Sequence, residues 1–72
     1  MIFRKYLDNK SIDHLELSMR ASRALFNLGI SRVGQLLDHS RDELKILGVS
    51  DKLLDSIEEE LMRFNLSLNN KP

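Results

Sequence analysis

Two glycine turns, each placed between an apolar run and a serine, constrain this 72-residue chain more than any other feature. The first is Leu28-Gly29-Ile30, followed by Ser31, and the second is Gly48-Val49-Ser50. Glycine after an apolar run is typical of a helix C-terminus, because glycine adopts the left-handed backbone conformation at little steric cost. A serine shortly afterwards is a preferred N-cap for a new helix. The sequence therefore predicts two units in which a tight turn joins two helices, with the backbone N–H groups of each turn free for a partner.

Apolar residues recur at helical spacing on both sides of these turns. Ser18 is the expected N-cap of a helix that ends at Asn27-Leu28, and Ser31 is the expected start of the next. Ser40 to Glu43 has the pattern of a capping box, and Ser50 is expected to cap the last helix. The positions expected to face the core are Ala21, Ala24, Leu25, Leu28, Val33, Leu36, Leu37, Leu44, Leu47, Leu54, Ile57 and Leu61. No stretch alternates as a strand does, so we predict an all-α fold, a compact bundle of four to five short helices.

The chain divides into three parts. Residues 1–11 form an N-terminal arm that contains apolar Ile2, Phe3, Tyr6 and Leu7. The pattern does not determine whether this arm is structurally ordered. Residues 12–68 form one helical domain, in which Gly34 allows close approach of a neighbour. Asn65 is expected to end the last helix in the left-handed conformation, with Leu66 and Leu68 folding back onto the core. Residues 69–72 are a polar tail.

Composition excludes several classes of function. The chain has no cysteine, and its two histidines, His14 and His39, are far apart and expected at the surface, so we expect no metal and no cofactor. No apolar run approaches the roughly 20 residues of a membrane span, and the N-terminus lacks the features of a signal peptide. The expected location is therefore cytoplasmic. The serines are explained as caps, and the three glutamates of residues 58–60 point in different directions on a helix, so we predict no catalytic site and no enzymatic activity.

Charge is unevenly distributed although the formal net charge is zero. Residues 1–35 contain six Lys/Arg and three Asp/Glu, whereas residues 36–72 contain five and eight. The acidic half centres on Asp55 and Glu58 to Glu60, which we expect to form a solvated helix face. A polyanion would have to meet the other side of the domain.

Three stretches resemble the C-terminal domain of the bacterial RNA polymerase alpha subunit. The family pattern D-x-L-E-L-S-V-R is matched by Asp13 to Arg20 (DHLELSMR), and I-x-x-V-G-E-L-L by Ile30 to Leu37 (ISRVGQLL). The pattern L-x-x-x-G-L-S-L is matched by Leu61 to Leu68 (LMRFNLSL). The resemblance covers residues 12–68 and implies a compact domain with helix-hairpin-helix character. It also implies binding to the minor groove of A/T-rich promoter DNA and contacts with sigma factor and activators. We expect the DNA binding to be weak, because only about three or four phosphates would be neutralised.

The resemblance assigns site residues as well. Arg20 corresponds to the family's key DNA-binding arginine at the start of the first helix, where a guanidinium can enter a narrow minor groove. The family's second hairpin, N-L-G-K-K-S, corresponds to residues 48–53, in which only Lys52 is kept. The predicted DNA-binding residues are Arg20, Arg23, Gly48, Ser50 and Lys52, with Arg32 as an outlying phosphate contact.

Departures from the family pattern support an alternative hypothesis. Asp51 replaces a lysine and would repel a phosphate, and Leu53 replaces a serine and suits a protein groove better than DNA. On the surface that faces sigma factor in the family, Asp13 and Glu16 stay acidic while His14 replaces an acidic residue. The alternative is a protein-interaction module that keeps the fold and has lost the DNA surface. Its contact residues would be Asp13, Glu16 and Leu53, and its partners sigma factor, an activator or RNA polymerase subunits.

The N-terminus also departs from the family, in which the domain follows a linker and a larger domain. Here the sequence begins at Met1 with the apolar arm. We expect a free-standing relative rather than a fragment of a longer subunit. We further expect a monomer, or a weak homodimer formed through the arm.

Overall fold

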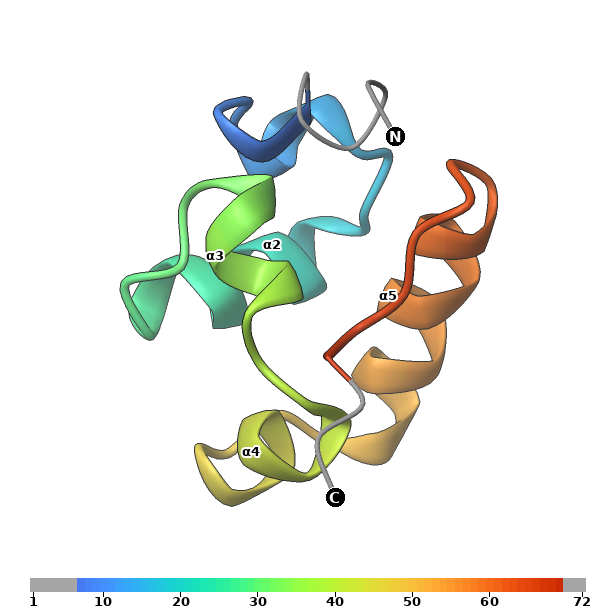
Figure 1. Cartoon of the computed structure of the whole chain (residues 1–72). Coiled ribbons are helices and arrows are strands. Elements are labelled where there is room, and N and C mark those ends of the chain that lie inside the picture. Colours follow the sequence, from blue (N-terminus) through green and yellow to red (C-terminus); the bar gives the residue numbers. More distant parts are fainter. Residues whose placement is uncertain (1–6, 70–72) are drawn as a thin grey trace.

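The computed structural model describes residues 7–69, which form four α-helices and one 3₁₀ turn (Figure 1). The elements are η1 (Ile12–His14), α2 (Met19–Asn27), α3 (Val33–Leu37), α4 (Arg41–Ile46) and α5 (Asp51–Met62). In Figure 1, α5 stands opposite α2 and α3, and α4 lies near its N-terminal end. The chain after α5 runs back alongside it, and the Asn69 N–H donates to the His39 carbonyl oxygen at 2.9 Å. The all-α prediction is confirmed.

Three of the four serines predicted as N-caps have that role. The hydroxyls of Ser18, Ser40 and Ser50 each accept from the backbone N–H three residues further on, at 3.1, 3.1 and 3.3 Å. The capping box is complete, because Glu43 Oε1 accepts in turn from the Ser40 N–H at 2.8 Å. These caps satisfy N–H groups that have no partner inside their helices.

The prediction that Ser31 starts the next helix is wrong. Helix α3 begins at Val33, with Arg32 in the N-cap position. The reason is a competing side chain from inside the helix, since Gln35 Oε1 accepts from the N–H groups of both Ser31 (2.9 Å) and Arg32 (3.0 Å). Because Gln35 already accepts from these N–H groups, the start of α3 does not need a serine cap.

Three helices end in the same hydrogen-bond motif. After α2, the Gly29 N–H donates to the Phe26 carbonyl and the Ile30 N–H donates to the Leu25 carbonyl, both at 2.9 Å. These two bonds define a Schellman motif. The same pair of bonds ends α4 at Gly48 and α5 at Asn65, and the three left-handed residues have φ of 81°, 110° and 61°. The predicted left-handed turns at Gly29, Gly48 and Asn65 are confirmed.

These motifs correct one prediction. The N–H groups of both glycine turns were expected to be free for a partner, but each glycine and the residue after it donate to the preceding helix. The residue that follows each left-handed position, Ile30, Val49 or Leu66, is buried. The turns therefore fold the chain back onto the core and offer none of these N–H groups to a ligand.

The core lies between α5 and the other helices. Its buried side chains are Leu7, Ile12, Leu15, Ala21, Leu25, Ile30, Val33, Leu36, Leu37, Leu44, Val49, Leu54, Ile57, Leu61, Leu66 and Leu68. Leu7, which the sequence places in the arm, is part of this core, while Ile2, Phe3 and Tyr6 lie outside the described residues. Gly34 packs closely on the backbone of Asp8, since a Cβ at Gly34 would lie 3.0 Å from the Asp8 carbonyl oxygen. None of the helices within residues 7–69 is long and apolar enough to span a bilayer.

Two other predictions about burial are wrong. Leu47 was expected in the core but is 49% exposed, because it is the C-cap of the six-residue α4 and only Leu44 of that helix is buried. Glu60 was expected on a solvated face but is 8% exposed. Its carboxylate accepts from the Glu16 N–H at 3.1 Å and from the Arg63 guanidinium at 3.3 Å, which compensates for its removal from water.

Candidate nucleic-acid interface

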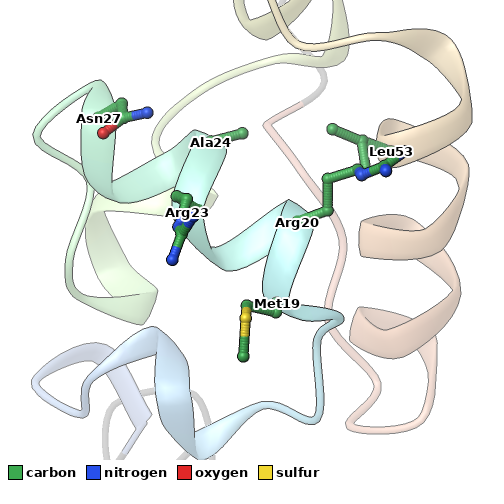
Figure 2. A pocket seen from close by; sticks show the side chains of 6 residues that line it. All are labelled: Met19, Arg20, Arg23, Ala24, Asn27 and Leu53. Carbon is green, nitrogen blue, oxygen red and sulfur yellow. The ribbon is translucent and has the colours of Figure 1, made fainter.

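An open groove with a volume of about 520 Å³ lies between α2 and the first turn of α5 (Figure 2). Figure 2 shows Arg20 reaching from the start of α2 toward Leu53 on α5, with Arg23 and Asn27 further along α2. Leu53 is half-buried against the core. The groove is lined by Met19, Arg20, Arg23, Ala24, Asn27 and Leu53.

The folding of α2 explains why its polar residues share this groove. Ala21 and Leu25 are fully buried and anchor one side of the helix to the core. Residues three, four and seven apart lie on the same side of an α-helix, so Arg20, Arg23 and Asn27 form one stripe along it. The Ser18 cap, two residues before Arg20, fixes the start of the helix at Met19. The core packing of α2 therefore presents these three side chains together.

Most of the cations within residues 7–69 fall into two sets. Arg41, Lys45 and Arg63 form salt bridges with acidic side chains, and the Arg32 guanidinium donates to the Asn9 carbonyl oxygen at 2.7 Å. By contrast, the side chains of Arg20, Arg23 and Lys52 form no salt bridge or hydrogen bond with residues 7–69, and all three residues are exposed. The predicted DNA-binding cations are thus available to an external anion, while Arg32 is held by the backbone.

The second glycine turn contributes less than expected to the groove. The N–H groups of Gly48 and Val49 donate to α4, and the Ser50 hydroxyl is used as the cap of α5. Of the residues predicted from this hairpin, only Leu53 lines the groove, while Lys52 is exposed in the first turn of α5.

Asp51 is engaged within the domain. Its carboxylate lies 3.2 Å from Lys45 Nζ and 3.4 Å from Arg41 Nη2. The hydrogen bond and the charge of Lys45, with a smaller contribution from Arg41, lower the pKa of Asp51 below its ordinary value. The negative charge that the sequence places at this turn is therefore balanced by two cations of α4.

Arg41 also binds two further acids of α5. Its guanidinium lies 3.0 Å from Asp55 Oδ1 and donates to Glu58. Hydrogen bonds to Glu58 and then Asp55 raise the pKa of Arg41 above its usual range. Much of the predicted acidic face is thus an ion-pair network that ties α4 to α5.

The residues predicted for protein contacts are not all on one surface. Leu53 belongs to the groove described above, whereas Asp13 lies at a neighbouring pocket of about 430 Å³. Glu16 is exposed, and its Oε1 lies 3.4 Å from Arg63 Nη1. The pocket at Asp13 is lined by Asp13, Leu17, Met19, Ser22, Arg23 and Phe26. Met19 and Arg23 border both pockets, so the two surfaces adjoin along α2.

The sequence interpretation did not include Met19, Ala24 or Asn27 as groove residues. The spacing of Asn27 from Arg20 and Arg23 was a usable signal, since all three occupy one side of a helix. No group of three or more His, Asp or Glu within residues 7–69 is arranged to hold a metal ion.

The chain is similar to a known family of bacterial protein domains. Residues 4–63 match the family model that describes the C-terminal domain of the alpha subunit of bacterial RNA polymerase. Among similar proteins, the RNA polymerase subunit alpha of Syntrophomonas wolfei is 45% identical over 58 residues, 79% of this chain and 18% of the subunit. Those of Thermotoga petrophila and Thermotoga maritima are 41% and 40% identical, over 90% and 83% of this chain and 20% and 18% of each subunit.

The chain therefore spans about a fifth of the length of these relatives. The family match covers most of the chain and includes α2, α3, α4 and α5. The protein belongs to the family of C-terminal domains of the bacterial RNA polymerase alpha subunit.

Proposed function

We propose that this protein is a non-catalytic, DNA-binding transcription module that contacts the minor groove of A/T-rich double-stranded DNA through the α2 groove. The observation that carries the proposal is the availability of Arg20 and Arg23. Both line one open groove and neither has an ionic partner within residues 7–69. Sigma factor, activators or other RNA polymerase subunits are the protein partners that family membership supports.

The chemistry of the groove suits a narrow minor groove. Arginine side chains are attracted to the enhanced negative potential of A/T-rich minor grooves. The apolar wall formed by Met19, Ala24 and Leu53 can contact deoxyribose without leaving polar groups unpaired. Because the chain has a formal net charge of zero and few available cations, we expect weak binding that falls steeply with salt.

A second candidate function is favoured by the apolar surface next to the arginines. Met19 is 77% exposed and Phe26 is 42% exposed, and both border the pocket at Asp13. A surface of this kind can bind a protein partner. The alternative is a protein-interaction module in which Asp13, Glu16 and Leu53 contact sigma factor, an activator or a polymerase subunit.

The two candidates differ in a direct titration. NMR chemical shifts of the ¹⁵N-labelled protein would be followed on addition of an A/T-rich duplex and a G·C-rich duplex of equal length. DNA binding predicts shifts centred on α2 with the A/T-rich duplex, and their loss in Arg20→Ala at an unchanged melting temperature. Absence of shifts at millimolar protein would reject the DNA proposal. Capture of sigma factor or polymerase subunits that is lost in Glu16→Lys would then support the alternative.

A further inference from the structure

We propose that Asn27 is a third DNA-contacting residue, which reads base edges in the minor groove beyond the contacts of Arg20 and Arg23. This inference rests on the proposed function. Asn27 is exposed and lines the same groove as the two arginines. Its carboxamide forms no hydrogen bond with residues 7–69, so its donors and acceptor are available to a ligand.

The position of Asn27 fits the spacing of base pairs. Figure 2 shows Arg23 between Arg20 and Asn27 along α2. Arg20 and Asn27 are seven residues apart, which is about 10 Å along the axis at about 1.5 Å per residue. This length equals about three base pairs of B-DNA at about 3.4 Å each. A duplex lying along the groove would therefore meet the two side chains at different base pairs.

The local electrostatics favour a base edge over a phosphate as the partner of Asn27. Asn27 is the last residue of α2, and the C-terminus of a helix carries a partial negative charge that repels a phosphate. The carboxamide N–H₂ can donate to adenine N3 or thymine O2, which are the acceptors of the minor groove. When Asn27 donates its N–H₂ at this edge, the guanine 2-amino group, which is also a donor, opposes it, so this orientation favours A·T over G·C at its own position.

The experiment is a base-pair scan measured by fluorescence anisotropy with an A/T-rich duplex. Each A·T pair is replaced in turn by G·C, and separately by inosine·C, which lacks the 2-amino group. In the unaltered protein, G·C at the pair read by Asn27 is expected to weaken binding about two- to tenfold, the range of a single hydrogen bond. Inosine·C at that pair is expected to restore the affinity.

Matched variants locate the contact. In Asn27→Ala the penalty at this one pair should disappear, while penalties at other pairs remain. Arg20→Ala should remove a penalty about three base pairs away. Ser22→Ala is the control, because Ser22 is on the same helix but lines the other pocket, and its scan should match that of the unaltered protein.

Each outcome decides a different point. If Asn27→Ala gives the same scan as the unaltered protein while Arg20→Ala does not, the inference about Asn27 is wrong and the proposed function stands. If Asn27→Ala weakens binding equally on every duplex, the contact is not to a base edge, and the inference is again wrong. If the unaltered protein binds no duplex, the proposed function itself fails.

Discussion

Removal of the Arg20 charge should lower the salt dependence of DNA binding by an amount that follows from the structure. Among the described residues, three predicted contact cations are free of ionic partners, namely Arg20, Arg23 and Lys52. Each phosphate neutralised on a duplex contributes about −0.9 to the slope of log K against log salt, so three give about −2.7. Affinity should then fall about 40-fold between about 50 and about 200 mM salt.

Arg20→Ala should reduce this slope to about −1.8, with an affinity loss of about 12-fold over the same salt range. Its affinity at low salt should also be lower, since the guanidinium no longer enters the minor groove. Arg20→Lys separates the two effects, because it keeps the charge and the slope but loses the planar guanidinium and part of the affinity. The assay is fluorescence anisotropy of a labelled A/T-rich duplex titrated at four or more salt concentrations.

Arg63→Ala is the matched control for this series. It removes the same charge, but Arg63 is paired with Glu16 and Glu60 and does not line the groove. Its slope should equal that of the unaltered protein, provided that its thermal unfolding shows a folded domain. Either of two results would refute the assignment of Arg20 as a phosphate-neutralising contact. One is an Arg20→Ala slope equal to that of the unaltered protein. The other is an Arg63→Ala slope reduced as much as that of Arg20→Ala.

Three further predictions concern stability. Gly48→Ala should lower the free energy of unfolding in urea by about 1–2 kcal/mol. Backbone strain is the main cost, because φ is 110° and a Cβ there meets no atom within 4 Å. A loss close to zero would contradict this, and Gly48→Asn should lose less. Leu25→Ala should cost about 2–5 kcal/mol because Leu25 is fully buried, whereas Met19→Ala, at 77% exposure, should stay within about 0.5 kcal/mol. Folding lowers the pKa of Asp51, so its ion pairs stabilise the fold at pH values above the unfolded pKa of about 3.9. This stabilisation is lost as the pH falls through the folded pKa. Asp51→Asn should therefore lose less stability than the unaltered protein between about pH 6 and about pH 2, and equal losses would show that these pairs contribute nothing.

Helix ends could be predicted from the sequence because capping is a local interaction. The caps at Ser18, Ser40 and Ser50 and the left-handed turns at Gly29 and Gly48 depend on residues within one or two turns of the chain. Local hydrogen bonding also explains why the prediction of free N–H groups at these turns was wrong. A Schellman motif uses the N–H groups that the sequence interpretation left free, and both bonds follow from the left-handed glycine itself.

Burial of charged residues could not be predicted in this way. Glu60 is buried because the Glu16 N–H, 44 residues earlier in the sequence, is placed beside its carboxylate by tertiary packing. No local pattern distinguishes Glu60 from its exposed neighbour Glu59. The groove depends on packing in the same way, since Leu53 joins Arg20 only when α5 lies against α2.

The ion pairs of Asp51 change how the second turn should be interpreted. From the sequence, an aspartate in place of the family's lysine indicated repulsion of DNA and loss of the DNA surface. In the structure, the aspartate pairs with Lys45 and Arg41. Arg41 also pairs with Asp55, one turn further along α5, so the charge of Asp51 belongs to a bridge between two helices. Short α4 buries only Leu44, and this bridge is a second link between α4 and α5. The carboxylate of Asp51 is therefore engaged by two cations of α4, and its presence does not by itself argue against DNA binding by α2.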